Sequence, residues 1–443
     1  MSLRKRAPAA VLAVWLLLGA CAEGGAGPDE SAVIRRDSAG ILIVEAAGPL
    51  WRQGDAWTVD AEPELVIGQV AGEAEYLFGE VRGAVRLDHG SVVVIDNQAR
   101  ELRWFDRSGA FVRAVGRPGG GPAEFPSSAW QLQRCGRDRL YAHDLWGRRI
   151  VVWDTTGVFQ RSFELVEPSR PGRGPYNHTC RPDGGFVAIG WGYDQIAPPA
   201  IPEGKEAVTY RQQSAVWALD SLGALERDLG NFLSSERIGH RNGSGPHPFG
   251  RAAKFAADPD RIFLGSGEGL AVGVYRIGAS DSAAQVADAA ANARAASGQE
   301  ASEAAGAAAT VPAAVPDEIW RARATGLAID DALLAAYAAA DTSVVRDQRS
   351  RRWVLEGEVE LPPELPGYTE LRVSPDGHLW TKRFVPPWER VERWGVFAPD
   401  GVFLGDVEFP ANLWVTDIGD EYVVGVAKDE LDVERVQVHR IRR

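Results

Sequence analysis

Apolar and polar residues alternate along two stretches of the chain that can be aligned without a gap. The first stretch covers residues 96–109 and the second covers residues 144–157, so the offset is 48 positions throughout. Each contains Asp-x3-Arg, then an alternating segment, then an aromatic residue followed by Asp-x2-Gly. Alternation of this kind is typical of a β-strand, and the closing Gly suits a tight turn.

Further short strands are predicted on both sides of each unit, at 91–95, 111–115, 139–143 and 159–163. A repeat of 40–50 residues with four short strands is typical of one blade of a β-propeller. Similar turn sequences recur near residues 183, 220, 376 and 400. They predict six blades, at about 80–116, 129–165, 176–233, 252–361, 368–409 and 413–443, with Trp353–Leu361 as the last strand of the fourth.

The sixth predicted blade ends after its third strand, Glu434–Ile441, whereas Leu65–Gly68 has the register of a fourth strand without a blade of its own. We expect Leu65–Gly68 to complete the sixth blade, because this closure removes two exposed sheet edges. Ile41–Val44 adds another strand there or packs on the rim. The predicted fold is all-β: residues 38–443 form a single six-bladed β-propeller of four-stranded antiparallel blades, closed by an N-terminal strand.

Residues 281–350 are predicted to form an insertion in the fourth blade. Its first part, 281–312, is Ala-rich and of low complexity. Apolar residues between Asp317 and Tyr337 then indicate an amphipathic helix. This helix is either a lid or docking element, or a helix packed on the side of the propeller. Because it is predicted to follow strand three, we expect it on the face opposite the loops between strands two and three.

The N-terminus has the pattern of an export signal. Arg4-Lys5-Arg6 precedes an uncharged apolar run over residues 9–18, too short to span a membrane as a helix. Leu18-Gly19-Ala20-Cys21 resembles the bacterial lipobox, which implies a signal peptide at 1–20, a lipidated Cys21 and a flexible tether at 21–37. The alternative is an ordinary signal with a chance Cys. Ala22, where Asp would indicate inner-membrane retention, favours the outer membrane.

The segment Gly116-Arg117-Pro118-Gly119-Gly120-Gly121-Pro122-Ala123-Glu124-Phe125 and the Asp-x3-Arg frame resemble NHL-type repeats. The chain is similar to six-bladed propeller lipoproteins of that kind, most clearly over residues 65–165. The resemblance implies the six-bladed fold. It implies little about activity, because propellers include both binding proteins and enzymes.

Composition restricts the partners. The formal charge is −13, from 48 basic and 61 acidic residues, which argues against a nucleic-acid partner. Apart from Cys21, the cysteines are Cys135 and Cys180, each directly before the first hairpin of its blade. Equivalent positions of neighbouring blades are adjacent, so these two either form a disulfide or remain two buried thiols.

The loops between strands two and three share one face of a propeller with the connections between blades. These segments carry aromatic, His and Arg side chains, which make a candidate binding face: Trp146, His178, Trp191, Tyr193, His240, His247, Arg383 and Trp388. The alternative is that these side chains only cap loops. A second set recurs at one register of the repeat and is interpreted as structural Asp–Arg pairs that hold loops: Asp96, Arg100, Asp144 and Arg148.

No catalytic residue is assigned, because the chain lacks a nucleophile-elbow, a His-Glu-x-x-His motif and a metal-spaced Cys cluster. We therefore expect a monomeric, lipid-anchored binding protein without a cofactor, whose partner is an unknown protein, small molecule or glycan. The alternative is a metal-dependent hydrolase or lyase of the six-bladed lactonase type, with a divalent cation in the central channel. Three or more converging acidic or amide side chains there would favour the enzyme.

The Cys21→Ser variant should move the protein from the membrane fraction to the soluble envelope fraction, because the lipid is attached through this thiol. Fractionation followed by immunoblotting measures this. Continued sedimentation of Cys21→Ser with membranes would contradict the lipid anchor.

Overall fold

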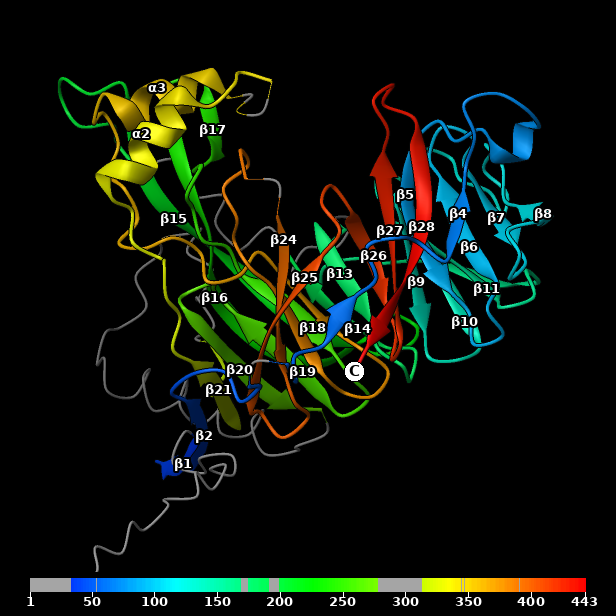
Figure 1. Cartoon of the computed structure of the whole chain (residues 1–443), viewed down its shortest axis with the longest axis horizontal. Coiled ribbons are helices and arrows are strands. Elements are labelled where there is room, and N and C mark those ends of the chain that lie inside the picture. The colour runs from blue at the N-terminus through cyan, green and yellow to red at the C-terminus, as the bar shows by residue number, and fades with distance from the viewer. Residues whose placement is uncertain are drawn as a thin grey trace, which may run out of the picture. The chain divides into compact units, whose positions relative to one another are not determined.

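The structure is a computed structural model that describes residues 33–52, 54–168, 174–190, 199–277, 313–343, 345, 347–389 and 391–443. These residues are nearly all in β-strands, which form six sheets of four to six strands in a propeller-like fold (Figure 1). Two α-helices lie among them, α2 (Asp331–Ala339) and α3 (Gln348–Leu355), with one 3-10 turn, η2 (Ala74–Tyr76). None of the described helices has the length and apolar character needed to cross a membrane.

The first three sheets follow one another along the chain. The first contains β5 (Val81–Arg86), β6 (Val92–Asp96), β7 (Glu101–Phe105) and β8 (Phe111–Val115). The second contains β9 (Gln131–Cys135), β10 (Arg139–Asp144), β11 (Arg149–Asp154) and β12 (Phe159–Glu164). The third contains β13 (Asn177–Cys180), β14 (Phe186–Ile189), β15 (Ala207–Leu219), β16 (Leu225–His240) and β17 (Gly243–Pro246).

The other three sheets include strands from the N-terminal part of the chain. The fourth contains β18 (Lys254–Ala257), β19 (Arg261–Gly265), β20 (Leu270–Arg276) and β21 (Glu318–Ala322), extended by β2 (Ile41–Ala46) and β1 (Val33–Ser38). The fifth contains β22 (Glu370–Val373), β23 (Leu379–Lys382), β24 (Glu392–Phe397) and β25 (Phe403–Phe409). The sixth contains β26 (Trp414–Ile418), β27 (Tyr422–Lys428) and β28 (Glu434–Arg442), with β3 (Thr58–Val59) and β4 (Leu65–Ile67) paired to β28.

The repeated Asp-x2-Gly sequence forms the turn between the third and fourth strands. In the first sheet the Asp106 carboxylate accepts the backbone N–H groups of Ser108 and Ala110. Asp154 does the same for Thr156 and Val158 in the second sheet. The glycine of the turn has φ +84° in the first sheet and +86° in the second, a conformation that residues with a Cβ rarely adopt. The sequence repeat is therefore a repeat of local hydrogen bonding.

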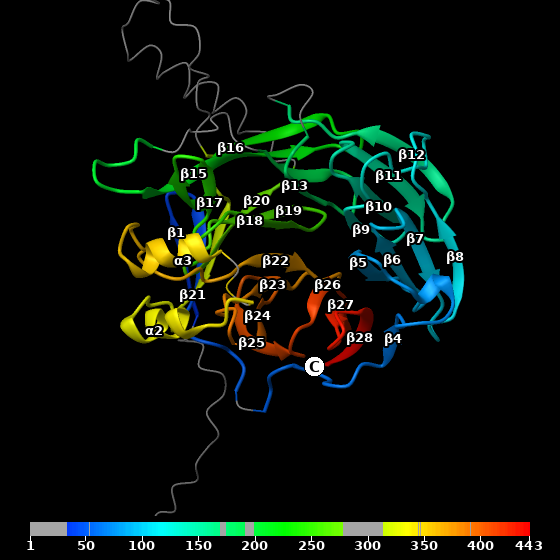
Figure 2. The same cartoon turned by 90° about the horizontal axis from the view of Figure 1, so that it is seen from above.

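Each sheet buries apolar side chains on both faces, because a separate hydrophobic cluster joins it to the next sheet in chain order. One cluster joins the first and second sheets through Trp104 and Trp153, and another joins the fourth and fifth through Trp320 and Phe397. The sixth sheet packs on the first through Val424, Val436 and Phe105 among others. The first strands of the sheets, β5, β9, β13, β18, β22 and β26, come together at the centre (Figure 2).

Residues 33–67 run along the last three sheets, which differs from the prediction for Ile41–Val44. β2 pairs in parallel with β21, so this segment extends the fourth sheet and not the sixth. The N–H groups of Leu50 and Trp51 then donate to Phe403 and Leu404 at the edge of the fifth sheet. β4 reaches the sixth sheet, where Leu65, Val66 and Ile67 pair with Val438, Gln437 and Val436. The first described strands therefore belong to the fourth sheet, and the expectation that Ile41–Val44 adds a strand to the sixth blade was wrong.

The insertion was also assigned incorrectly in two places. Residues 318–322, predicted as helix, form strand β21, and Trp353, predicted in a strand, lies in helix α3. Alternating burial of Glu318–Ala322 explains the strand, since Glu318, Trp320 and Ala322 are buried between sheets. The helix expected before Tyr337 is present as α2. Residues 281–312 lie outside the described residues.

The predicted position of the helices, on the face opposite the loops between strands two and three, was also wrong. Since β21 is the fourth strand of its sheet, α2 and α3 belong to the connection between the fourth and fifth sheets. That connection lies on the same face as the loops between strands two and three, and the helices stand beside the ends of β15 and β17 (Figure 1).

Candidate functional site

One open cavity of about 1310 Å³ is lined by the first strands of all six sheets and by the hairpins that follow them. This is above the usual range of about 300–1,000 Å³ for small-molecule sites. No helix contributes to its wall, and the lining runs from β5 through β9, β13, β18 and β22 to β26. A cavity that every sheet helps to line is the strongest candidate for a ligand site in the described part of the chain.

The candidate face predicted from the sequence is mostly separate from this cavity. Of its members, His178 lines the cavity, whereas Trp146 is 75% exposed in the loop between β10 and β11. Trp191 and Tyr193 lie outside the described residues. Arg383 follows β23, where its side chain lies 3.6 Å from Asp406 and burial lowers its pKa.

The remaining predicted residues, His240, His247 and Trp388, are packed beneath the insertion helices. The His240 ring lies 5.3 Å from that of Trp353, and the Trp388 ring lies 5.8 Å from that of Tyr337. His247 is 4% exposed. Trp353, Tyr337 and Trp388 belong to a hydrophobic cluster between the helices and the long β15–β16 hairpin. His240 and Trp388 therefore contact this cluster, and the His247 ring lies 6.2 Å from that of Phe249 in the same cluster.

The repeated Asp and Arg residues hold loops, but they do not pair with each other as predicted. The Asp96 carboxylate accepts the backbone N–H groups of Gly79, Glu80, Gln98 and Ala99, and its ionic partner is Arg103. Arg100 adopts a positive φ and donates to the carbonyl groups of Phe125 and Pro126.

The second copy of the pair behaves in the same way. Asp144 accepts from the backbone of Ser127, Ser128 and Gly147, and the partner of Arg148 is Glu164. In both sheets the carboxylate accepts backbone N–H groups, which explains why the Asp recurs although its contact with Arg103 is found only in the first sheet.

The first strands share a common register, so residues from six sheets meet at the same level of the cavity. Two levels matter, and both are defined by the pairing of the first and second strands. We name as the lower ring Val85, Gln133, Thr179, Ala256, Arg372 and Asp417. The upper ring lies two residues before the lower ring in each first strand, or three residues before it in β26, where a bulge adds one residue. We define it as Gly83, Gln131, Asn177, Lys254, Glu370 and Trp414.

Polar members of the lower ring join neighbouring strands to one another. The Gln133 side chain donates to the carbonyl of His178 and accepts the N–H of Cys180. Arg372 donates to the carbonyl groups of Val415 and Thr416. The lower ring therefore uses its polar atoms for structure.

Asp417 is the acidic member of the lower ring. Burial raises the pKa of this carboxyl above its usual range, although the N–H of Arg86 and the charges of Arg134 and Arg372 favour the ionised form. The Tyr422 hydroxyl lies 3.3 Å from it. A half-buried carboxyl with several partners is a positioning group in the wall rather than a free acid.

The upper ring keeps most of its hydrogen-bonding capacity. Among the described residues, the side chains of Gln131 and Trp414 make no hydrogen bond, and Lys254 makes neither a hydrogen bond nor an ion pair. Asn177 uses its side-chain oxygen to accept the N–H of His178. The sequence prediction missed this ring. The sequence did contain a signal for it. In five of the six sheets, one polar or aromatic residue lies at nearly the same number of positions before the first hairpin.

Basic side chains in the rest of the cavity wall are paired with carboxylates. Arg86 lies 2.6 Å from Glu64, Arg134 lies 2.9 Å from Asp88, and Arg372 lies 2.6 Å from Glu370. Arg261 lies 2.7 Å from Asp258. Most charge in the wall is thus neutralised locally, in contrast to Lys254.

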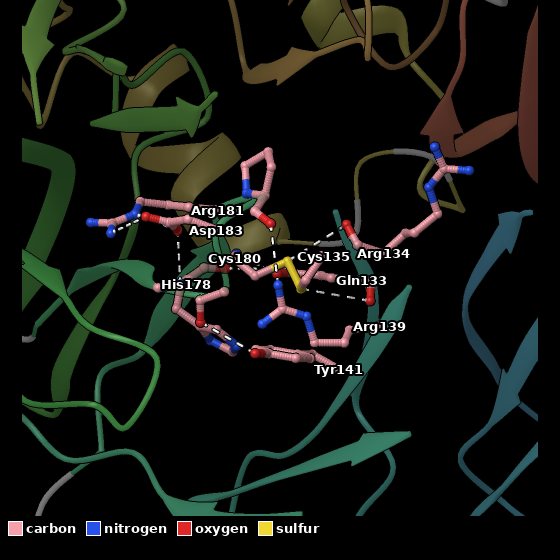
Figure 3. The surroundings of a disulfide bond; sticks show 12 residues. Gln133, Arg134, Cys135, Arg139, Tyr141, His178, Cys180, Arg181 and Asp183 are labelled. Atoms are coloured by element: carbon pink, nitrogen blue, oxygen red, sulfur yellow. Dashed lines mark hydrogen bonds and ion pairs between the residues drawn. A yellow bond between two sulfur atoms is a disulfide. The ribbon is translucent and has the colours of Figure 1, made fainter. Parts of the chain in front are cut away.

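A disulfide between Cys135 and Cys180 joins the ends of β9 and β13 at the cavity wall, and Figure 3 shows it beside the Gln133 bridge. The Cα atoms are 5.7 Å apart. Together with Gln133, this bond holds the second sheet to the third at the level of the hairpins. From the sequence, a disulfide and two buried thiols were both expected as alternatives for these neighbouring cysteines.

Among the described residues, no three or more His, Cys, Asp or Glu side chains form a group that could hold a metal ion. Most carboxylates of the wall contact Arg side chains or backbone N–H groups, for example Asp88, Asp258 and Glu370. The criterion for the lactonase-type alternative also included amide side chains, and Gln131 and Asn177 lie in the wall of the same cavity as Glu370.

The chain matches no known family model, and no curated protein sequence matches it either. Its structure is similar to a candidate exported protein from Bacteroides fragilis, at 12% identity and a TM-score of 0.45, over 90% of this chain and 99% of that one. A member of the DUF4221 family from Bacteroides vulgatus has 9% identity and a TM-score of 0.41, over 87% and 99%. Virginiamycin B lyase from Staphylococcus aureus has 10% identity and a TM-score of 0.34, over 82% and 95%. Similarity at this level carries no argument about function.

Two buried histidines beside the cavity make stability depend on pH. The rings of His143 and His178 lie 4.4 Å apart, and burial lowers the pKa of His143 from 6.5 to about 4 and that of His178 well below 6.5. Between these values the unfolded chain binds more protons than the folded chain, so the free energy of unfolding falls as the pH drops from about 7 to about 4. His143 alone contributes about 3 kcal/mol to this loss.

We expect His143→Phe to reduce the pH dependence of the free energy of unfolding between pH 7 and pH 4.5, measured by urea denaturation. His89→Gln, at an exposed histidine, is the matched control and should leave the slope unchanged. An unaltered slope in His143→Phe would show that this histidine is not held neutral by burial.

Proposed function

We propose that this chain is an exported lipoprotein that binds a small polar ligand in the cavity between its six sheets. In this proposal the sheets are the six blades of one closed, NHL-type propeller, in which β4 completes the sixth blade. Cys21 anchors the protein, and Ala22 favours the outer membrane. The observation that carries the binding function is the upper ring, in which the side chains of Gln131, Lys254 and Trp414 line a large cavity without a hydrogen-bond partner among the described residues.

The cavity replaces the loop-rich face as the preferred binding surface. Of the described members of that face, His240 and Trp388 contact the cluster beneath α2 and α3. Trp146 is exposed, but one indole is far smaller than the roughly 800 Å² per partner that a stable protein interface buries. A concave site with a few convergent polar groups suits a small molecule or a glycan instead.

The wall supports binding better than metal-dependent hydrolysis. A hard divalent cation needs several oxygen ligands that face one point. Here Asp88, Asp258 and Glu370 each lie within 3 Å of an arginine nitrogen. Each of these carboxylates already has a cationic partner, so binding a metal would require breaking those pairs.

Blocking the cavity tests the proposal. Thr179→Trp places an indole in the lower ring, where Thr179 is half-buried and lines the wall. Val158→Trp, at an exposed turn residue, is the matched control. We expect a library of neutral, cationic and anionic sugars and amino acids to contain compounds that raise the melting temperature of the wild type and of Val158→Trp, but not of Thr179→Trp.

Two outcomes would contradict the cavity as the binding site. One is a library in which no compound stabilises the wild type. The other is equal stabilisation of wild type and Thr179→Trp, because it would place the binding site elsewhere.

A further inference from the structure

We propose that the ligand of the cavity is an acidic sugar, whose carboxylate binds Lys254 and whose ring packs against Trp414. This inference rests on the proposed binding function and specifies the ligand class of the same site. It rests on a difference between the two rings: polar side chains of the lower ring bond to neighbouring strands, whereas Lys254, Gln131 and Trp414 of the upper ring make no such bonds in the described chain.

Lys254 is the group in the cavity wall that we expect to bind an anion. Among the described Arg and Lys residues of the wall, its side chain alone has neither an ion pair nor a hydrogen bond, although Glu370 lies in the neighbouring strand of the upper ring. Burial lowers the pKa of Lys254, and the charge of Glu370 opposes this effect. A partly desolvated ammonium group without a direct partner gains more from a ligand carboxylate than a solvated one does.

The acidic groups near the upper ring already have partners, whereas Asp420 and Glu421, at the turn between β26 and β27, have no ion pair in the described chain. Glu370 lies 2.6 Å from Arg372, and Asp417 accepts the backbone N–H of Arg86. Asp376 contacts both His378 and Arg443. The negative charges near the upper ring therefore have partners already. The site is selective for anions even though the whole chain carries a formal charge of −13.

The neutral members of the upper ring are mainly hydrogen-bond donors. The Asn177 side-chain oxygen is occupied by the N–H of His178, which leaves its amide N–H groups for a ligand. The Gln131 amide and the Trp414 indole N–H are also free within the described part of the chain. Donors around a cation suit a ligand rich in acceptor oxygens, such as a carboxylate with neighbouring hydroxyl groups.

Trp414 adds the preference for a ring. Its side chain is 43% exposed although it lines the cavity, and large aromatic side chains of globular proteins are on average much more buried. An open indole beside polar groups offers a flat apolar surface to the C–H face of a sugar ring. The volume of about 1310 Å³ admits a short oligosaccharide.

Trigalacturonate and its fully methyl-esterified form test the inference, because they share their rings and hydroxyl groups and differ in charge. Isothermal titration calorimetry would use the Cys21→Ser protein at low salt. We expect trigalacturonate to bind at least tenfold more tightly than the ester. Lys254→Met should remove this preference, and Lys254→Arg should retain most of it.

Matched variants separate the contributions of charge and ring. Arg137→Met removes a positive charge whose side chain is 90% exposed at the rim of the same cavity, and should weaken trigalacturonate binding no more than about threefold. Trp414→Ala should weaken both the acid and the ester. Circular dichroism and the melting temperature of each variant show that the fold is kept.

Equal affinity for acid and ester, or an undiminished preference in Lys254→Met, would overturn the acidic-sugar inference and leave the binding function intact. Failure of both trisaccharides, with other library compounds still bound in the cavity, would also overturn it. Failure of every library compound in the cavity-blocking experiment is the distinct outcome that contradicts the proposed function itself.

Discussion

The packing of the sixth sheet on the first is the contact on which the rest of the structure depends. Every sheet has two apolar faces, so a sheet without a neighbour on one side would expose a row of core side chains. Valines of β27 and β28 meet Val81, Val92 and Phe105 of the first sheet, and Ile67 of β4 lies in the same cluster. Burial of each such side chain contributes roughly 1.5–3 kcal/mol.

Side-chain hydrogen bonds fix the alignment of this contact. The Thr416 hydroxyl donates to the carbonyl of Ala84, and the N–H of Val81 donates to Glu434. Tyr422 donates to the carbonyl of Arg86. These bonds connect the two ends of the proposed ring at the level of the cavity. The first strands of the first and sixth sheets are therefore held at one level, as the two rings of wall residues require.

The two rings differ in how their polar atoms are used. Gln133, Arg372 and Asp417 of the lower ring bond to neighbouring strands and position them. One level above, Lys254 and Trp414 face the same cavity without such bonds in the described chain. Both side chains are only partly buried, so their donor groups remain accessible to the ligand proposed above.

Sequence periodicity predicted the parts of the fold that repeat locally. The Asp-x2-Gly turns and the alternation around Trp104 and Trp153 located the first two sheets within a few residues. The prediction of a helix at Glu318–Ala322 was wrong, because a five-residue strand beside an Ala-rich segment has too few residues to establish a period of two. It failed for His240 and Trp388 because the helices that cover them come from a distant part of the sequence. Tertiary packing of this kind leaves no local signal.

The most direct test of the account is whether residues 65–67 lie beside the last strand. Val66 and Gln437 are directly paired between β4 and β28. Cysteines at these positions in the Cys21→Ser protein should be joined within one molecule by a short bismaleimide cross-linker, as shown by mass spectrometry of the tryptic peptides. Cysteines at 66 and 158 should not be joined. Absence of the 66–437 cross-link in the folded protein would contradict the proposed closure and, with it, the cavity that depends on it.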